Sequence, residues 1–437
     1  MNDSNFWSGI SRLTAIPEGS PVQKRVIQVE ERPPLLLNLP LSLQHLFAMF
    51  GATVLVPFLF KVNPTTCLFM NGIGTLLYLF LTRGKIPSYL GSSFAFISPV
   101  LLIMASSGYA AAQSGFIAFG LMFIFFAAVI KATGTKWLDV LFPPAAMGAI
   151  IAVIGLELAP TAGSMAGLVG DNINMDNVLV SMFTLAVTVI GSVAFKGFLA
   201  IIPVLFGVIC GYIFAFFMGM VDFAPVIAAP WIQIPEFYAP SFDINAILII
   251  APAALVVRVE HIGHLMVTGN VVERDLINNP GLSRSLFADG CSNVLSGFFG
   301  ATPNTTYGEN IGVMAITRVY SVWVIGGAAC MAILLSFVGK LSELIRGIPV
   351  PVMGGVCLLL FGVIAASGLR VLVERRVDYG KTSNLVMTSV VMTIGLSGAK
   401  LSLGSVTVQG MVLATLIAIA MSLGFKVFEK FGLLRND

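Results

Sequence analysis

A few acidic and imidazole side chains lie within the apolar parts of this chain, and their spacing could support chemistry. Glu260 and His264 are four residues apart in the stretch VVRVEHIGHLMV, so a helix would present both on one face. Glu309 follows the polar run NTTYG and directly precedes another apolar segment. An ionisable side chain in a hydrocarbon layer costs about 2.5–3.5 kcal/mol on insertion scales. Each of these residues therefore needs a functional or structural reason.

The polar run before Glu309 has the composition of a short extended segment. Residues 301–308, ATPNTTYG, are bounded by Pro and Gly and are rich in Thr and Tyr, and residues 91–96, GSSFAF, have a related composition. We expect each run to lead into a half-helix, whose free amide N–H groups are hydrogen-bond donors. Such irregular backbone persists in a bilayer only where protein or a wet cavity surrounds it. The predicted pocket has acceptors in Glu260 and Glu309 and aromatic walls in Phe94 and Tyr307.

These groups suit a small, flat, neutral ring that alternates N–H and C=O groups. Carboxylates would accept hydrogen bonds from the ring N–H groups, and main-chain amides would donate to the ring carbonyls. His264 lies beside Glu260, and an imidazole exchanges protons near physiological pH, so proton coupling by these two residues is expected. No catalytic residue, metal site or cofactor is expected, because the sequence lacks Ser/His/Asp, Cys/His and metal-ligand spacings.

The composition is that of an all-α polytopic membrane protein. Of 437 residues, 57% are hydrophobic and only 10% are charged, against about 25% charged in soluble domains. Apolar runs long enough to cross a bilayer recur along the chain. We predict fourteen membrane segments, near residues 41–60, 68–82, 93–106, 115–130, 141–158, 178–195, 198–219, 246–268, 285–299, 308–319, 321–339, 349–367, 384–398 and 409–428.

The distribution of basic residues predicts the orientation of these segments. Of 24 Lys and Arg residues, 19 fall on one side, 4 on the other, and Arg258 falls within a segment. The loops 159–177 and 220–245 contain no basic residue. By the positive-inside rule, both termini are expected in the cytoplasm. Residues 1–34, which lack the pattern of a cleavable signal, are expected to form a loosely ordered cytoplasmic tail.

The two halves of the chain resemble each other. LFMNGIGTLLYLF, residues 68–80, matches LFADGCSNVLSGF, residues 286–298, at five of thirteen positions. PPAAMG at 143–148 and PVPVMG at 349–354 share a Pro-x-x-x-Met-Gly spacing. Seven segments per half is an odd number, so the second copy would be inverted, as in many secondary transporters. We expect the third and tenth segments to contribute short antiparallel strands at mid-membrane, where the repeats meet.

The stretch ENIGVMAITR, residues 309–318, resembles the signature of the nucleobase–ascorbate transporter (nucleobase:cation symporter-2) family. The Gln44–His45 pair, GSSFAFISP at 91–99 and EHIGHL at 260–265 are also similar to that family. Glu rather than Gln at the head of the signature resembles the uracil-type members. The resemblance implies uracil:proton symport across the bacterial inner membrane by alternating access, with lipid around the protein and no nucleic-acid partner.

The resemblance also implies a homodimer and a division into core and gate domains. Uracil would contact the side chains of Glu260 and Glu309 and the backbone at Phe94 and Gly308, and His264 would take part in proton coupling. The implied units are the tail 1–34, core segments 35–140 and 246–345, and gate segments 141–245 and 346–437.

Several alternatives and departures stay open at the level of sequence. The substrate could be another nucleobase, such as xanthine or thymine, and Na⁺ in place of H⁺ is not settled. A channel or an anion exchanger is less favoured, since two carboxylates would repel an anion. Arg258 departs from the aliphatic residue expected at its position, and pairing with Glu260 would put proton coupling in doubt. Structural roles are predicted for Asp289, Glu157 and His45.

Overall fold

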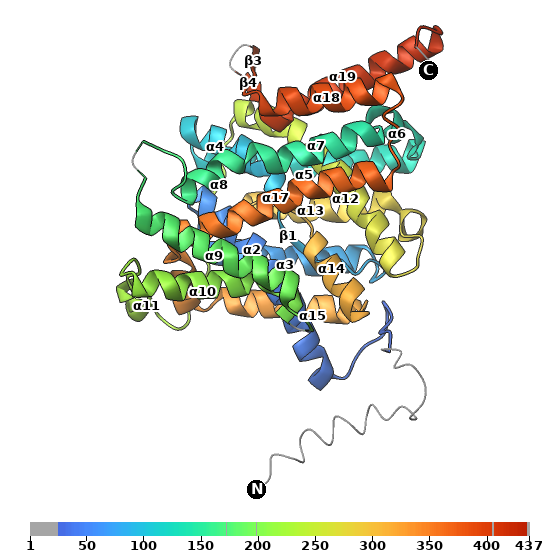
Figure 1. Cartoon of the computed structure of the whole chain (residues 1–437). Helices are drawn as coiled ribbons and strands as arrows, with labels where there is room; N and C mark the ends of the chain where they lie inside the picture. The colour runs from blue at the N-terminus through green and yellow to red at the C-terminus, as the bar shows by residue number, and fades with distance from the viewer. Residues whose placement is uncertain (1–24, 172, 198, 404–405, 435–437) are drawn as a thin grey trace.

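The structure is a computed structural model that describes residues 25–171, 173–197, 199–403 and 406–434. Most of this chain is helical, with the longer helices running roughly alongside one another (Figure 1). The helices are α2 (Leu35–Phe60), α3 (Pro64–Leu81), α4 (Ile97–Ser106), α5 (Tyr109–Thr133), α6 (Lys136–Leu141), α7 (Pro144–Glu157), α8 (Ala159–Met165), α9 (Met175–Ala194), α10 (Pro203–Phe217), α11 (Ala224–Ala228), α12 (Ile244–Val271), α13 (Leu282–Phe299), α14 (Gly308–Thr317), α15 (Val322–Ser336), α16 (Gly339–Arg346), α17 (Val350–Glu374), α18 (Thr382–Leu396) and α19 (Gly410–Lys430).

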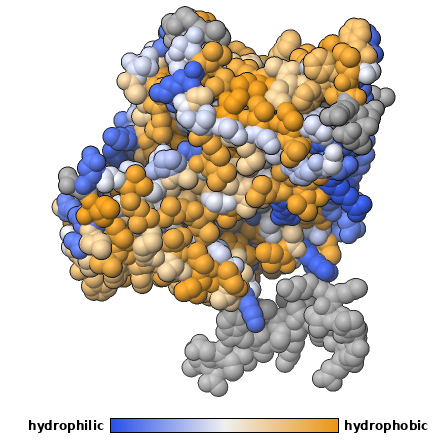
Figure 2. All heavy atoms as spheres, turned by 45° about the horizontal axis from the view of Figure 1, so that its top comes forward, coloured by the Kyte–Doolittle hydropathy of each residue, from blue (hydrophilic) through white to orange (hydrophobic). Residues whose placement is uncertain are grey.

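A helix overlaps each of the fourteen predicted segments. By length and composition, 8 helical spans within the described residues could cross a membrane, and four shorter apolar helices accompany them. Neither α13 nor α14 is among these twelve: α13 carries many polar residues, and the short α14 includes Glu309 and Asn310. Large apolar side chains lie on the outside of the molecule, including Phe80, Val193 and Phe217. The face in Figure 2 is accordingly largely hydrophobic, and hydrophilic residues gather toward its two sides.

Local sequence signals set several of the helix starts. The Asn63 side chain accepts a hydrogen bond from the Thr65 amide at 3.0 Å, and Pro64 occupies the first turn of α3, where a missing N–H costs nothing. The Asp243 carboxylate accepts from the amides of Asn245 and Ala246 at the start of α12. These caps fix where α3 and α12 begin; α3 packs against β1, and α12 carries Glu260 and His264.

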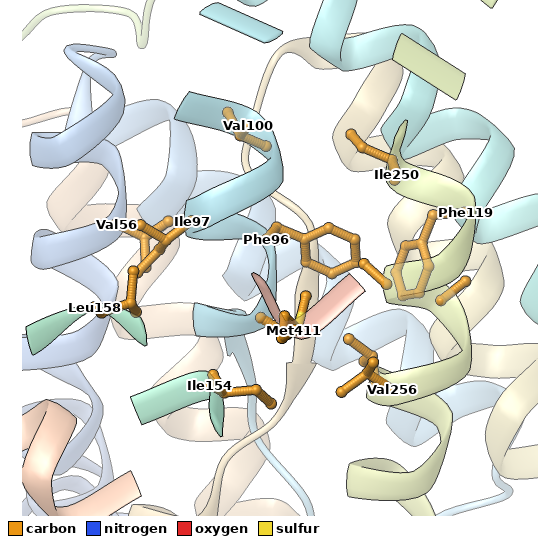
Figure 3. Close-up of a cluster of buried hydrophobic side chains, with 14 of the residues drawn as sticks. Val56, Phe96, Ile97, Val100, Phe119, Ile154, Leu158, Ile250, Val256 and Met411 are labelled. Atoms are coloured by element: carbon orange, nitrogen blue, oxygen red, sulfur yellow. The ribbon is translucent and has the colours of Figure 1, made fainter. Parts of the chain in front are cut away.

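The helices pack as two groups. Helices α2 to α5 pack mainly with α12 to α15, and helices α7 to α10 pack mainly with α17 to α19. Fewer contacts join the groups, between α2 and α10, between α12 and α7, and between α12 and α19. Figure 3 shows one of the buried clusters, where the rings of Phe96 and Phe119 lie 4.7 Å apart, with Ile250, Val256 and Met411 nearby.

The packing pattern is nearly unchanged when the two halves of the chain are exchanged. Helix α3 packs on α15, and their counterparts α13 and α5 pack on each other. In the same way α9 contacts α17 as α18 contacts α7, and α9 contacts α10 as α18 contacts α19. The likeness of the halves that the sequence suggests thus extends to how their helices contact one another.

Helices α5 and α13 approach each other closely through glycine. A Cβ on Gly120 would lie 2.6 Å from the Val294 amide, and a Cβ on Gly290 would lie 2.7 Å from the Gly120 carbonyl. Small residues permit such backbone contact between membrane helices. This contact holds α13 in place and leaves its polar residues facing α3 and α12.

Two small sheets accompany the helices. Strands β1 (Leu90–Ser92) and β2 (Asn304–Thr306) pair antiparallel, with Gly91 opposite Thr305. Strands β3 (Lys400–Leu403) and β4 (Val406–Gln409) form a second antiparallel pair directly before α19. The sequence analysis missed this pair, although Leu401, Leu403, Val406 and Val408 alternate as in a strand.

The described part of the predicted N-terminal tail is not loosely ordered. The Ile27 amide donates to the Arg318 carbonyl at 3.0 Å, and the Tyr320 amide donates to the Ile27 carbonyl at 2.8 Å. Glu30 also pairs with Arg274, whose Nη2 donates to Oε2 at 2.8 Å. Residues 25–32 therefore form a strap against the ends of α12 and α14, and the expectation for them was wrong because these pairings are long-range. Residues 1–24 lie outside the described residues.

Candidate functional site

The site lies where the paired strands lead into helices. Strand β1 is followed by a 3-10 turn, Phe94–Phe96, and then α4, whereas β2 leads into α14 at Gly308. The antiparallel pairing of β1 with β2 therefore brings Phe94 and Gly308 to neighbouring places. No side chain of the described residues caps the start of α14 or of the 3-10 turn. The first amides of both elements remain available to a ligand.

Glu260 and Glu309 meet at this junction. Glu260 lies on α12, which packs against β2, α14 and the 3-10 turn, and Glu309 lies in the first turn of α14. The two carboxylates are close enough to interact electrostatically, and Glu309 is exposed while Glu260 is half-buried. Within the described chain, the only hydrogen bond to either carboxylate comes from the Glu309 amide. Apart from this bond within Glu309, the pair presents acceptors without partners in the described chain.

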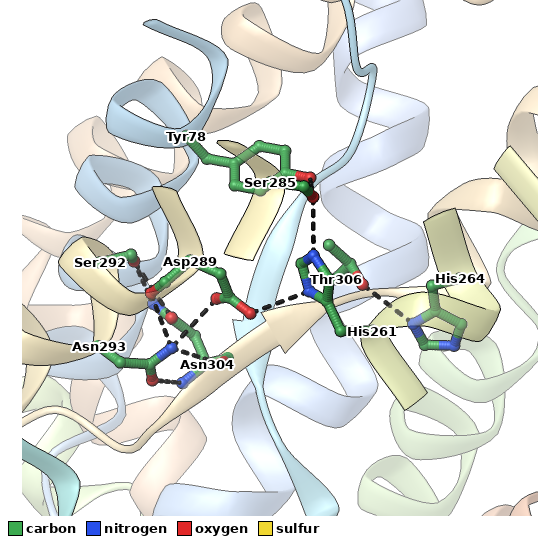
Figure 4. A network of polar contacts seen from close by, with 9 residues as sticks. All are labelled: Tyr78, His261, His264, Ser285, Asp289, Ser292, Asn293, Asn304 and Thr306. Atoms are coloured by element: carbon green, nitrogen blue, oxygen red, sulfur yellow. Dashed lines mark hydrogen bonds and ion pairs between the residues drawn. The ribbon is translucent and has the colours of Figure 1, made fainter. Parts of the chain in front are cut away.

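His264 also reaches the start of α14. Its Nδ1 lies 3.1 Å from the Thr306 hydroxyl at the end of β2, a contact visible in Figure 4. Its Nε2 faces Gly308, where an added Cβ would lie only 3.3 Å away. One ring nitrogen of His264 is therefore held by β2, and the other faces the start of α14, next to Glu309.

Phe94 borders the second group of helices. Its half-buried ring meets Phe361 of α17 edge to face, with centroids 6.4 Å apart and an interplanar angle of 82°. The paired strands lie with the group of α2 to α5 and α12 to α15, whereas Phe361 lies in the group of α7 to α10 and α17 to α19. The candidate site consequently lies at the boundary between the two groups of helices.

Tyr307 is placed differently from the other predicted site residues. Its side chain is buried, its hydroxyl donates to the Ser92 carbonyl at 2.9 Å, and its ring covers Gly91. A Cβ on Gly91 would lie 2.3 Å from that ring, so only glycine fits there. This geometry favours Tyr307 as a support for the paired strands.

His45 supports the same junction from α2. The Asn310 side chain donates to the His45 carbonyl at 3.0 Å and lies 3.1 Å from its Nδ1. Both residues are buried. These contacts hold the first turn of α14 against α2, in keeping with the structural role predicted for His45.

Arg258 does not pair with Glu260. Its buried guanidinium lies over the rings of Phe126, Trp137 and Phe142, at 4.1, 5.3 and 5.2 Å from their centroids. Cation–π attraction of this kind supplies part of the stabilisation that lost hydration removes. Arg258 therefore joins α12 to α5 and to the segment around α6, away from the two carboxylates.

Asp289 and Glu157 hold hydrogen-bonded positions, as the sequence analysis expected. The Ser98 hydroxyl donates to Glu157 Oε1 at 2.6 Å, and the Met411 amide donates to its Oε2 at 2.9 Å. Asp289 accepts from Asn293 at 3.1 Å and lies 3.0 Å from His261. Sequence reasoning missed the partners His261, Ser285 and Tyr78. The polar residues at 285, 289, 292, 293 and 296, which share one helix face, are the signal that could have found them.

Comparisons with known proteins agree with a transporter fold. The murine solute carrier 26 family member A9 anion transporter, in its inward-facing state, superposes with a TM-score of 0.71 at 11% identity, covering 97% of this chain and 75% of that one. At this identity the likeness concerns the fold alone. The apolar helices of the chain, together with the family membership given next, make it a multi-pass membrane protein.

The family model Xan_ur_permease, described as "Permease family", matches residues 38–404, and the chain belongs to this family. A protein of Escherichia coli (strain K12) named uracil permease is 63% identical over 409 residues, 93% of this chain and 95% of that one. A uracil permease of Paenibacillus larvae subsp. larvae is 58% identical over 415 residues, 94% of this chain and 99% of that one. Membership of a permease family makes the chain a transporter and not an enzyme.

Proposed function

We propose that this chain imports uracil together with a proton across the bacterial inner membrane by alternating access. One observation carries the proposal: two carboxylates, Glu260 and Glu309, converge beside the uncapped start of α14. Relatives at 63% and 58% identity that are named uracil permease support uracil as the substrate. No cofactor is invoked.

The proposed contacts follow the chemistry of the ring. The carboxylates of Glu260 and Glu309 accept hydrogen bonds from the two ring N–H groups of uracil. Backbone amides at Phe94 and Gly308 donate to its carbonyl oxygens, and the Phe94 ring covers one face. Tyr307 supports the strands from behind. His264 and Glu260 exchange the coupled proton, since both lie at the ring and carry groups that titrate.

The proposed architecture has fourteen membrane segments in a 7+7 inverted repeat, with the paired strands near mid-membrane. The near-symmetric contacts of the two halves support the repeat. The group of α2 to α5 and α12 to α15 is the core, within 35–140 and 246–345, and the remaining helices form the gate, within 141–245 and 346–437. Both termini face the cytoplasm, as the basic residues favour, and the working unit is a homodimer. The contact of Phe94 with Phe361 supports a site at the core–gate boundary.

Radiolabelled uracil uptake in cells lacking their own uracil permease tests this proposal. We expect saturable uptake that a protonophore abolishes, and its loss in Glu260→Ala and in Glu309→Ala. Glu374→Ala is the matched control, because Glu374 is exposed and, among the residues that the structure describes, forms its ion pair with Arg370, at 2.7 Å. Unchanged uptake in either site variant would exclude the proposed site.

A competition panel separates uracil from other nucleobases. Unlabelled uracil should suppress uptake at lower concentration than xanthine or thymine, because xanthine is larger and thymine adds a methyl group. Stronger suppression by xanthine would assign the transporter to a purine substrate.

A further inference from the structure

A buried chain of proton-carrying side chains lies beside the proposed site and has no part in substrate binding. The side chain of His261 of α12 points toward Asp289 and Ser285 of α13 (Figure 4). Its Nδ1 lies 3.0 Å from Asp289 Oδ2, and its Nε2 lies 2.7 Å from the Ser285 hydroxyl. That hydroxyl lies 2.6 Å from the hydroxyl of Tyr78 on α3. Asp289, His261, Ser285 and Tyr78 are all fully buried.

Each of these four side chains can both accept and donate a proton. A neutral imidazole accepts a proton on one nitrogen and releases one from the other, and hydroxyl groups relay protons by the same exchange. A carboxyl group next to the imidazole can be the source or the recipient. A merely structural polar contact does not need three consecutive amphoteric groups in a line.

The Asp289 end of this row of side chains adjoins the proposed substrate site. Glu260 precedes His261 in α12 and interacts electrostatically with Asp289. Asn293 connects Asp289 to β2: its side chain donates to Asp289 at 3.1 Å and to the Asn304 carbonyl at 2.9 Å. The strand then continues to Thr306, which contacts His264.

The Tyr78 end of the row lies toward one side of the protein, near the end of α3 and the start of α13. Tyr78 is near the end of α3 and Ser285 near the start of α13. Ser88 also lies within reach of the Tyr78 hydroxyl. Beyond these residues the Lys85 amine donates to Asn279 at 2.8 Å on the exposed surface. The basic residues here belong to the side predicted to be cytoplasmic.

We propose that Asp289, His261, Ser285 and Tyr78 form a proton relay that carries the coupled proton between the substrate site and the cytoplasmic side. The inference rests on the proposed proton coupling and adds a route separate from that of the substrate. Asp289, which interacts electrostatically with Glu260, takes up the proton and passes it to His261 Nδ1, 3.0 Å from its Oδ2. Nε2 then gives up its proton to Ser285, whose own proton moves to Tyr78 and outward, and no bond other than O–H and N–H bonds changes.

Reconstituted protein in liposomes tests the relay with two readouts. Exchange of labelled for unlabelled uracil at equal pH needs no net proton transfer, whereas uracil-dependent acidification of the lumen does. The variants to compare are Tyr78→Phe, Ser285→Ala and Ser285→Val. The valine side chain also fills the space that a water molecule could take in Ser285→Ala. Exchange should stay within about twofold of the wild type, a difference of about 0.4 kcal/mol. Proton flux should fall about 100-fold, as when a positioned acid or base is lost.

Ser296→Ala is the matched control. Ser296 is buried on the same face of α13 and contacts Asn304 at 3.3 Å, but it lies outside the relay. Any loss that the Ser296→Ala substitution causes should be equal in uracil exchange and in proton flux. Relay variants with normal proton flux, or with exchange and flux lost in proportion, would overturn the relay. A wild type that exchanges uracil but moves no proton would instead overturn the proposed coupling itself.

Discussion

The carboxylates at the strand junction lie where a neutral ring can satisfy them. Glu260 is half-buried and Glu309 is exposed, and neither has a side-chain partner within the described chain. Once a bound ring encloses them, an acceptor left unpaired costs about 1–3 kcal/mol. A ligand that supplies two N–H groups removes this cost. A ligand that lacks one of them does not.

Methylated uracils test this pairing without any mutation. 1-Methyluracil and 3-methyluracil each lack one ring N–H, so each should compete with labelled uracil at least about tenfold less well, since one carboxylate stays unpaired. 5-Fluorouracil keeps both N–H groups and is the matched control. Competition by both methylated rings as strong as that by uracil would show that the carboxylates do not accept from the ring.

Substitutions of Arg258 test whether this charged residue, two positions before Glu260, stabilises the protein through packing and has no effect on uracil binding. Arg258→Ala removes the side chain from between Phe126, Trp137 and Phe142 and should destabilise the protein by about 2–5 kcal/mol, as other buried truncations do. Arg258→Met keeps the volume and removes the buried charge, so it should stay within about 1 kcal/mol. Thermal unfolding in detergent measures both variants.

Uracil affinity should be unchanged in both Arg258 variants, because Arg258 does not touch Glu260. Tenfold weaker binding in Arg258→Ala with unchanged unfolding temperature would instead connect Arg258 directly to the site.

At the scale of elements, the backbone contact of α5 with α13 sets the position of the polar helix. Gly290→Ala should destabilise the protein by about 1–3 kcal/mol, because the new Cβ would lie 2.7 Å from the Gly120 carbonyl. Gly424→Ala on α19 is the matched control, since its Cβ would meet no atom within 4 Å. Equal unfolding temperatures for the two variants would contradict the close contact.

An ion pair between Glu30 and Arg274, which follows the end of α12, helps to hold the strap of residues 25–32. Arg274 holds the pKa of Glu30 below its ordinary value, so this pair stabilises docking above pH 4.5 and loses its effect as the pH falls through the lower folded pKa. The pair is partly exposed and worth about 0–1 kcal/mol, so amide exchange at Ile27 should rise by up to about fivefold in Glu30→Gln at pH 7. Hydrogen–deuterium exchange, corrected for intrinsic rates, measures this change.

Below the folded pKa of Glu30, the exchange rates at Ile27 in the wild type and in Glu30→Gln should converge. A constant ratio of the two rates across the pH range would mean that another contact holds the strap.

At the scale of the whole molecule, alternating access requires the two groups of helices to move against each other. Gly51 of α2 and Val204 of α10 face each other across the groups, and a Cβ on Gly51 would lie 3.4 Å from that of Val204. This is close to the Cβ separation of about 3.5–4.5 Å in disulfides. Oxidised Gly51→Cys/Val204→Cys should bind uracil without transporting it, and reductant should restore transport. Full transport by the cross-linked form would contradict relative motion of the groups.

How far the sequence predicted this molecule depends on the distance over which each contact acts. Apolar length and composition located a helix in every predicted segment, because helices form from local signals. The spacing of Glu260 and His264 likewise predicted that they share a face. The approach of His261 to Asp289 depends on how α12 is rotated against α13, and the burial of Tyr307 depends on Gly91 in the other half. Neither follows from a local pattern.

The most direct test is calorimetric binding of uracil to the purified protein. Wild-type protein should bind uracil, whereas Glu260→Gln and Glu309→Gln should each bind at least about tenfold more weakly, because an amide accepts less strongly than a carboxylate. Glu374→Gln should bind like the wild type. Equal affinity in wild type, Glu260→Gln and Glu309→Gln would contradict the central claim that these two carboxylates hold the substrate.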